Sequence, residues 1–343
     1  MLNFNGGTST VWQIVRDTNY KRSDSASSRA FVNFNGGTLK TTNTSGAFGS
    51  GSEAIDRVTV FAGGATLDTD GRNIASDMPI SAPNGKGVVS VPVPAEVLSK
   101  TFAAPPSVTI IGDGEGASAR VLFNPTTGNV TGVQVLSPGW GYTSAKARFN
   151  HGGYTCIGES IVELDDVECG QLVKAGTGVY TFNAANSVTK LKVAGGSVKS
   201  GVNNTFPAET SLTLDGGNYD MNGYSQSFGN VSFGASGGKF LNGTAAAGNL
   251  VCDFAAALAG NPGVADLSNV SFAAGAKTLI TGYDPDELET LESVLLLRFA
   301  SGAVPASVPP LDESVELPKG WVLRMTQAGL KLSRQNGLVL IFR

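Results

Sequence analysis

Pairs of adjacent glycines recur along the chain and constrain its fold more than any other feature. A Gly-Gly pair supplies the positive φ angles that a sharp backbone corner needs. Most pairs are followed by a short segment in which apolar and polar residues alternate, which is the periodicity of a β-strand. The pairs lie at 6–7, 36–37, 63–64, 152–153, 195–196, 216–217 and 237–238. The chain is therefore expected to consist of repeated units of strand, corner and strand.

Such units predict a parallel β-helix. Each coil of that fold stacks on the previous one through main-chain hydrogen bonds about 4.8 Å away, and a single coil cannot bury its own apolar edge. The alternative is an antiparallel sandwich with Gly-rich hairpins, for which Asn222-Gly223 and Asn242-Gly243 would be suitable turns. The even spacing of the last three Gly-Gly pairs favours coils. We predict an all-β, right-handed parallel β-helix, a solenoid, with a small β insertion and a C-terminal cap.

The composition allows a folded core and argues against several functional classes. Hydrophobic residues make up 41% of the chain and charged residues 15%, so disorder is not expected. A net charge of −4 without a basic cluster argues against a nucleic-acid surface. His151 is the single histidine, which argues against His-based catalytic triads and multi-histidine metal sites. No apolar stretch reaches the roughly 18 residues of a transmembrane helix, and we expect neither a cofactor nor insertion of this segment into a membrane.

The beginning of the chain looks like the middle of a longer protein. The segment Asn-Phe-Asn-Gly-Gly at 3–7 recurs at 33–37. The first residues have neither the charged start nor the apolar run of a secretion signal. We expect Met1 to be an addition to a segment of a longer exported protein, with further domains attached.

Two stretches carry a family resemblance. The segments KAGTGVYTF at 174–182 and LKVAGGSV at 191–198 resemble the autotransporter-associated β-strand repeat, and 212–229 looks like its companion half. The string at 66–71 is similar again. The resemblance covers about half the chain, mainly 30–90 and 172–245. It implies a β-helical passenger segment of a large bacterial surface protein and says almost nothing about activity.

A second resemblance covers 106–153. The segment GWGYTS at 139–144 looks like a short "GSGYTSAP" β-module of surface and fibre proteins, although Lys146 stands where that pattern usually has proline. Ala103-Ala104-Pro105-Pro106 suits an extended linker before it. We therefore expect a β insertion here.

The region after about residue 275 has a different pattern. Asp284 and Pro285 suit the start of a short helix, and apolar segments at 294–299, 321–325, 330–332 and 338–342 predict closing strands. The predicted divisions are β-helix coils with Gly-Gly corners at 1–100, a β insertion module at 101–155, a β-helix with autotransporter-type repeats at 156–275 and capping strands at 276–343.

The three cysteines, Cys156, Cys169 and Cys252, are too few and too scattered for a disulfide framework. A bridge between Cys156 and Cys169 is sterically conceivable. We expect buried free thiols instead.

Carboxylates are the first candidate site residues. The densest acidic cluster contains Asp165 and Asp166, with Glu163 and Glu168 beside them. Paired carboxylates can hydrolyse glycosidic bonds when they are held about 5 to 9 Å apart. The alternative, which we favour, is a solvated acidic loop or a casual Ca²⁺ site. We assign no catalytic residue and no metal ligand, and we keep Asp165 and Asp166 as candidate ligand-binding residues.

Aromatic residues are the second candidates. Flat rings cover sugar faces, and Tyr and Trp are favoured at protein interfaces. We therefore consider Trp140, Tyr142 and Tyr154 candidate residues for binding carbohydrate. The alternative is that these rings stack along the edges of coils.

Two functional hypotheses follow. The first is a non-catalytic segment of a secreted or surface-exposed bacterial autotransporter-like protein, acting as a structural stalk or as an adhesin that presents loops to glycans or host surface proteins. Low charge, scarce histidine and the lack of a catalytic motif favour it. The alternative is a β-helical polysaccharide lyase or glycoside hydrolase that uses surface carboxylates. We predict the first, and therefore no enzyme.

Overall fold

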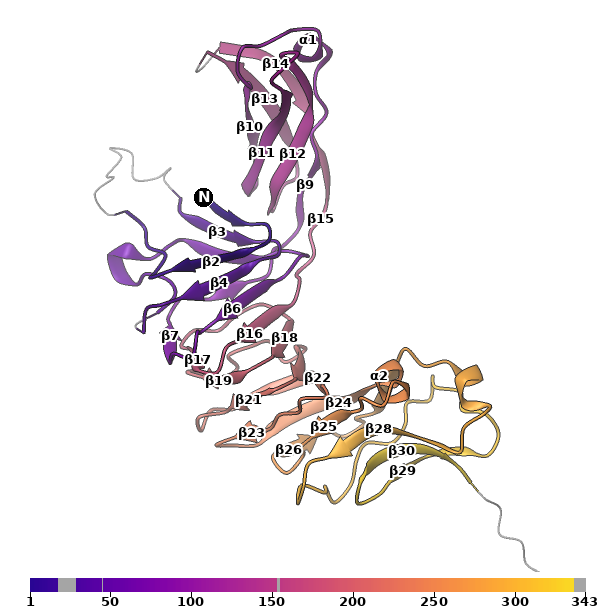
Figure 1. The fold of residues 1–343 in the computed structure, drawn as a ribbon. Coiled ribbons are helices and arrows are strands. Elements are labelled where there is room, and N and C mark those ends of the chain that lie inside the picture. The colour runs from indigo at the N-terminus through magenta and orange to yellow at the C-terminus, as the bar shows by residue number, and fades with distance from the viewer. Residues whose placement is uncertain (18–28, 45, 153–154, 336–343) are drawn as a thin grey trace, which may run out of the picture.

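The chain is an all-β protein with extensive parallel pairing of its strands. A computed structural model describes residues 1–17, 29–44, 46–152 and 155–335. Figure 1 shows a long stack of parallel strands, a β module that projects beside its N-terminal end, and a mixed sheet at the C-terminal end. The predicted all-β class is confirmed.

The longest sheet in the described part of the chain has ten strands, all paired in parallel. Its strands are β2 (Thr8–Val11), β4 (Thr38–Thr41), β6 (Ala65–Asp68), β16 (Leu172–Ala175), β18 (Lys190–Val193), β20 (Ser211–Leu214), β22 (Ser227–Phe233), β24 (Ala245–Asp253), β26 (Val270–Phe272) and β27 (Thr278–Thr281). Both β26 and β27 pair with β24. We call this the long sheet.

Two shorter parallel sheets complete the stack. One consists of β1 (Leu2–Phe4), β3 (Phe31–Phe34), β5 (Arg57–Val60) and β8 (Ile80–Ser81). The other consists of β7 (Ile74–Ser76), β17 (Val179–Phe182), β19 (Gly196–Ser200), β21 (Gly217–Asp220) and β23 (Phe240–Leu241). From β16 to β24 the chain alternates between the long sheet and this five-stranded sheet, so each repeat adds one strand to both.

The interior of the stack is filled by side chains that point inward at alternate positions along each strand. Leu191, Leu212 and Val231 occupy the same register position in three neighbouring strands of the long sheet, and all three are buried. A continuous chain of ring contacts runs through Tyr180, Phe182, Phe206, Tyr219 and Phe228. Because each repeat covers the inward residues of its neighbours, the repeats bury their core jointly.

Paired glycines form corners of the stack, as predicted. Gly196 has a φ of +60°, and a Cβ atom placed on it would lie 2.1 Å from the carbonyl oxygen of Gly178. A Cβ on Gly238 would lie 2.3 Å from the carbonyl oxygen of Gly217. These corners therefore need glycine because successive repeats approach too closely for a side chain.

An insertion between β8 and β16 forms the projecting module. It contains β9 (Lys86–Ser90), α1 (Ala95–Leu98), β10 (Ser107–Gly112), β11 (Glu115–Asn124), β12 (Asn129–Trp140), β13 (Ala145–His151), β14 (Thr155–Ile161) and β15 (Glu163–Asp166). The hairpin β11–β12 and the antiparallel sheet β10-β13-β14 form its two layers. Strand β6 pairs directly with β16, so the stack continues across the insertion.

The module is larger than the predicted 101–155. Val88, Val97 and Val162 belong to its core, and β9 pairs antiparallel with β15. The incoming and outgoing segments are therefore part of the module, and we use "the module" for residues 86–166.

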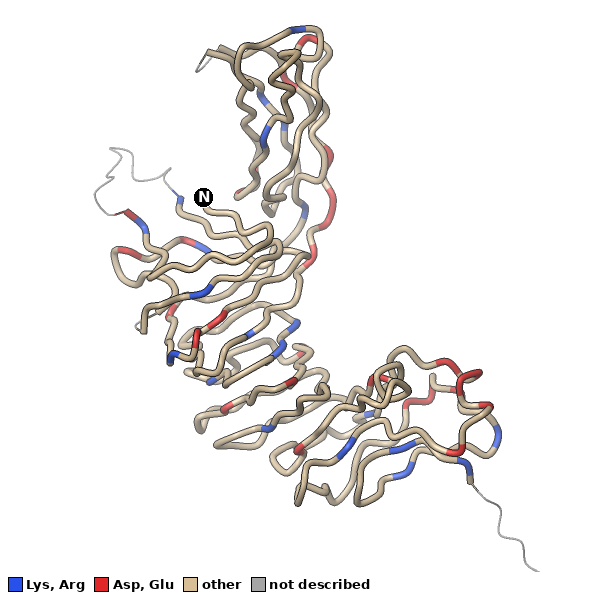
Figure 2. The backbone as a smooth tube through the Cα atoms, viewed as in Figure 1, with Lys and Arg blue, Asp and Glu red and all other residues tan. Residues whose placement is uncertain are grey.

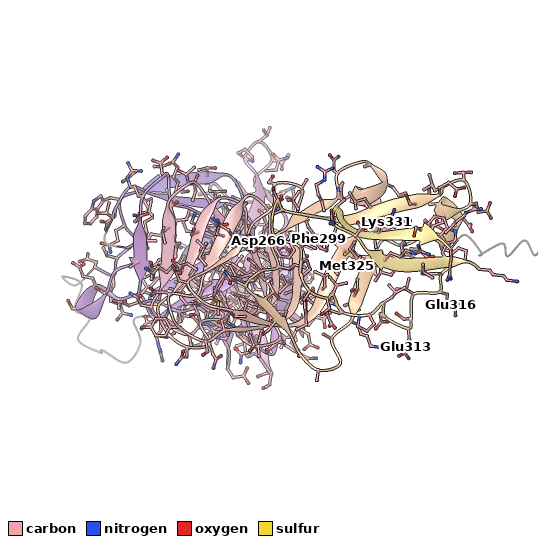
Figure 3. The ribbon with its side chains drawn as sticks, turned by 90° about the horizontal axis from the view of Figure 1, so that it is seen from below. Asp266, Phe299, Glu313, Glu316, Met325 and Lys331 are labelled. Atoms are coloured by element: carbon pink, nitrogen blue, oxygen red, sulfur yellow. The ribbon has the colours of Figure 1, made fainter. Side chains whose placement is uncertain are left out.

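The C-terminal end carries a mixed sheet. Its strands are β25 (Gly263–Ala265), β28 (Ser293–Phe299), β29 (Trp321–Met325) and β30 (Gly329–Arg334), in the order β25-β28-β30-β29. Figure 3 shows this end from below, with Phe299, Met325 and Lys331 on its strands. The strands expected at 294–299, 321–325 and 330–332 are present, whereas 338–342 lies outside the described residues.

Four short helices interrupt the described strands, α1 within the module and three outside it. Besides α1, these are η1 (Gly51–Glu53), α2 (Phe254–Leu258) and η2 (Pro285–Leu288). The side chain of Asp284 accepts a hydrogen bond from the Asp286 backbone at 3.0 Å, as expected for a helix start. No described helix combines the length and apolar character needed to cross a bilayer.

Candidate functional site

The module is held against the stack by a buried tryptophan. The ring of Trp140 packs edge-on against Phe31, with 5.2 Å between ring centroids, and lies 6.5 Å from Phe61. The guanidinium of Arg57 lies over the same indole, 4.4 Å from its centroid. Trp140 is 5% exposed. The stack and the module therefore share a small apolar core.

Asparagines of the repeated Asn-Phe-Asn-Gly-Gly segment form a polar contact beside this core. Asn3 pairs in register with Asn33, and Phe4 pairs with Phe34. Because neighbouring residues of a strand face opposite sides, the two phenylalanines stack inside, 4.7 Å apart, and the asparagines face outward.

These outward amides donate hydrogen bonds to the module. The donors and acceptors are Asn3 Nδ2 to Ser118 Oγ at 2.9 Å, Asn33 Nδ2 to Ser137 Oγ at 3.1 Å and Asn5 Nδ2 to the Leu136 carbonyl at 2.8 Å. Polar and apolar contacts together fix the module on the outer face of the β1-β3-β5-β8 sheet.

The predicted aromatic site residues are used inside the protein. Tyr142 is buried in the module core, and burial raises the pKa of its hydroxyl. A Cβ on Gly114 would lie 2.4 Å from the Tyr142 ring, and one on Gly116 would lie 2.4 Å from the Trp140 ring. Neither ring therefore offers a free face to a sugar, and Tyr154 lies outside the described residues.

The predicted acidic site residues lie on the strand that leads back to the stack. Asp165 and Asp166 are exposed on β15, where they pair with Gly87 and Lys86. The Asp165 carboxylate accepts a hydrogen bond from the Asp166 backbone at 2.8 Å. Among the described residues, no group of three His, Cys, Asp or Glu side chains is placed to hold a metal ion.

The described cysteines are all free. Cys156 is exposed, Cys169 is half-buried and Cys252 is buried. Burial raises the pKa of the Cys252 thiol to about 12. The three cysteines are free, as predicted, whereas the predicted burial holds only for Cys252.

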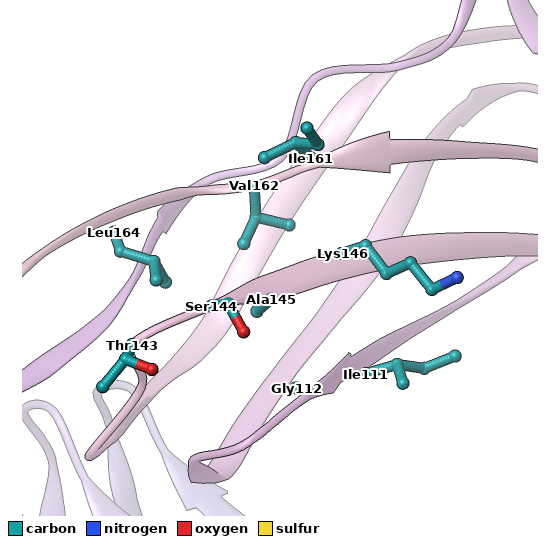
Figure 4. A pocket seen from close by; sticks show the side chains of 9 residues that line it. All are labelled: Ile111, Gly112, Thr143, Ser144, Ala145, Lys146, Ile161, Val162 and Leu164. Carbon is teal, nitrogen blue, oxygen red and sulfur yellow. The ribbon is translucent and has the colours of Figure 1, made fainter.

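The module does carry a pocket on the outer face of its three-stranded sheet, at the end from which β15 leads back to the stack. Its volume is about 540 Å³. Figure 4 shows its lining, which consists of Ile111, Gly112, Thr143, Ser144, Ala145, Lys146, Ile161, Val162 and Leu164. We call this the module pocket.

Two isoleucines flank a lysine in this pocket. Ile111 pairs with Lys146, and Lys146 pairs with Ile161, so the three side chains form one row across the sheet. Ile161 is 83% exposed and Ile111 is 37% exposed. Sequence analysis missed this site, although Ile110 and Ile111 are adjacent and must point to opposite faces of their strand.

A three-residue charge cluster adjoins the pocket. Lys146 Nζ and Arg148 Nε each donate to a different oxygen of Glu159 at 2.7 Å. These cations lower the pKa of Glu159. Two cations share one carboxylate, so the cluster keeps a positive charge beside the isoleucines.

The pocket rim is fixed by Asp113. The Thr143 hydroxyl donates to its carboxylate, as do the backbone N–H groups of Thr143 at 2.9 Å and Ser144 at 3.0 Å. These hydrogen bonds, the hydroxyl first, lower the pKa of Asp113 to about 2. The pocket is therefore preformed at neutral pH.

The polar side chains that line the module pocket are those of Thr143, Ser144 and Lys146. Its described lining contains no Asp, Glu, His or Cys. No protein-family model, no curated protein and no solved structure matches this chain.

Proposed function

We propose that this chain is a non-catalytic, adhesive stalk segment of a secreted or surface-exposed bacterial protein. In this proposal the stack of parallel strands is a right-handed β-helix of autotransporter type. The module is the part that it presents to a host surface. The proposal is supported most directly by the fixed mounting of the module, through Trp140 and the asparagine contacts.

The stack has the properties that a stalk requires. The main-chain hydrogen-bonding groups of its parallel strands pair with one another along the long sheet. Lys, Arg, Asp and Glu are interspersed along it without a band of one sign (Figure 2). A repeat architecture also lengthens by adding units and needs no separate core.

The chemistry of the module pocket favours a protein partner over a glycan. Exposed isoleucines stabilise complexes by burying apolar surface, whereas sugars mainly require polar groups and aromatic rings. The positive cluster of Lys146, Arg148 and Glu159 favours a partner with acidic residues around an apolar anchor.

Binding assays on host surface material test this proposal. The purified chain is passed over immobilised host-cell surface proteins, mucin glycans and plant and bacterial polysaccharides, and release of reducing or unsaturated ends is followed in the same tubes. We expect retention on surface proteins without product. Retention should fall at least tenfold for Ile161→Asp, which places a charge in the apolar lining of the module pocket.

The control is Val89→Asp, which changes an exposed apolar residue of the module outside the pocket. Equal loss in both variants, or no retention of the wild type, would contradict the proposal. Product release would instead support the polysaccharide-active alternative.

A further inference from the structure

A second concave surface lies on the stack, far along the chain from the module. It is a groove of about 360 Å³ on the outer face of the long sheet. One side is the corner after β20 and β22, including Asp215, and the other is the segment 253–263 that contains α2. We call it the sheet groove.

The floor of the sheet groove is one row of outward side chains. Lys192, Thr213, Ser232 and Val251 are paired in register across four neighbouring strands. The hydroxyls of Thr213 and Ser232 are hydrogen-bonded to each other at 2.8 Å. Each hydroxyl oxygen has two lone pairs, so this pair retains acceptor capacity toward the groove.

A donor stands at one end of this row. Lys192 Nζ donates to Asp215 Oδ2 at 2.8 Å. An ammonium has three hydrogens, and this ion pair uses one of them. Asp215 also accepts from the Ser236 backbone at 3.2 Å, and its pKa is lowered, first by the Lys192 hydrogen bond.

The opposite wall adds an acid and an amide. Asp253 caps α2, since its Oδ1 accepts from the Ala256 backbone at 2.9 Å. Asn261 lies in the turn after α2, and its Nδ2 donates to the Ala259 carbonyl at 3.4 Å, a long contact. Val251 and Ala256 leave a small apolar patch between these polar groups.

This arrangement selects a ligand class. The groove combines an ammonium donor, carboxylate acceptors and two hydroxyls that can do both, which suits the adjacent hydroxyls of a sugar and leaves few groups unpaired on binding. Two carboxylates against one ammonium disfavour an acidic ligand. The volume lies at the lower end of small-molecule sites. We infer that the sheet groove binds one or two units of a neutral saccharide.

The groove is arranged for binding rather than cleavage. Asp215 is committed to Lys192 and to a backbone N–H, and Asp253 is committed to its helix. Both carboxylates therefore accept hydrogen bonds within the protein, whereas glycoside hydrolysis requires a carboxylic acid that protonates the leaving group. This inference concerns the stack alone and does not depend on the module pocket.

Saturation-transfer difference NMR on the whole chain tests the inference. The ligands are maltose, lactose and cellobiose as neutral saccharides, glucosamine as a cationic sugar and glucuronic acid as an anionic sugar, each at millimolar concentration. We expect at least one neutral saccharide to bind, and glucuronic acid not to bind. The double variant Thr213→Val/Ser232→Ala removes both floor hydroxyls with little change in shape and should weaken binding about tenfold or more.

The matched control is Thr66→Val, which removes a hydroxyl from the same face of the long sheet, outside the groove. Ala256→Trp is a second variant that fills the groove and should also abolish binding. Thermal unfolding confirms that each variant is folded. The inference is overturned if no neutral saccharide binds, if glucuronic acid or glucosamine binds better, or if Thr66→Val weakens binding as much as the double variant.

Discussion

The guanidinium of Arg57 lies over the indole ring of Trp140, 4.4 Å from its centroid. Arg57 belongs to strand β5 of the stack, and Trp140 ends strand β12 of the module. Arg57 also donates to the Ala82 carbonyl at 2.7 Å, immediately before the chain enters the module. This contact therefore joins the two parts of the protein at the point where one leaves the other.

Truncating this tryptophan should loosen the module. For Trp140→Ala we expect a loss of about 3–5 kcal/mol in the free energy of unfolding, since a buried ring and its cation contact are removed. Urea denaturation measures the loss. Trp12→Ala is the control because Trp12 is 66% exposed, and it should change stability by less than about 1 kcal/mol. Similar losses in both variants would contradict the mounting described above.

Two reasons for glycine at the corners, the close approach of successive repeats and the positive φ, can be tested separately. Gly196 and Gly223 both have positive φ, but a Cβ on Gly223 would have no atom within 4 Å. We expect Gly223→Ala to cost about 1–2 kcal/mol from backbone strain alone, and Gly196→Ala to cost clearly more. Thermal and urea unfolding of both variants measure the difference. Equal costs would show that the close approach between repeats does not contribute to the requirement for glycine at the corners.

A buried lysine should make stability depend on pH. Lys174 Nζ donates to the carbonyls of Ala175, Gly176 and Gly195 at 2.8, 2.9 and 3.0 Å, and burial lowers its pKa from 10.5 to about 8. Between these two pH values the unfolded chain binds more protons than the folded chain, so the free energy of unfolding rises with pH. Below about pH 8 both states are protonated and this contribution stays constant.

The comparison with Lys174→Met isolates this contribution. Urea denaturation at pH 7, 8, 9 and 10 should show wild-type stability rising relative to Lys174→Met across the upper part of the range. Lys190→Met, on the exposed side of the neighbouring strand, serves as the control and should follow the wild type. Parallel curves for wild type and Lys174→Met would rule out the predicted shift.

Removing the carboxylate of Asp113 should loosen the rim of the module pocket. Because folding lowers the pKa of Asp113 to about 2, its stabilising contacts are complete above the ordinary carboxylate pKa and are lost as pH falls toward 2. For Asp113→Asn we expect faster hydrogen exchange at the amides of Thr143 and Ser144 at neutral pH. Asp166→Asn, on the exposed β15, should leave those rates unchanged. Unchanged exchange rates in Asp113→Asn would show that the carboxylate does not hold the rim in place.

Local sequence patterns predicted the features that depend on local geometry. The Gly-Gly pairs predicted corners such as Gly196, and alternation predicted strands such as Lys190–Val193 with inward Leu191. Both depend on φ angles and on which face a residue takes, and a few neighbouring residues determine these. Asp284 predicted a helix start for the same reason.

Features that depend on distant segments were not predictable in the same way. The module core combines Val88 with Val162, and no short pattern shows that these segments pair. Trp140 was considered a candidate ligand-binding residue because flat rings cover sugar faces. Its partners Phe31 and Arg57 come from a distant part of the chain, so no local pattern shows that the ring is buried. The sheet groove likewise combines side chains from several repeats, so only the parallel register brings them together.

Double electron–electron resonance, which measures the distance between two spin labels, tests the central claim that the module is held rigidly on the stack. Spin labels are attached at Thr127→Cys in the module and Ala235→Cys on the stack, both exposed, after Cys156 and Cys169 are replaced by serine. We predict one narrow distance distribution for the full chain, and a broad one when Trp140→Ala is added. A broad or multiple distribution without that substitution would contradict the claim.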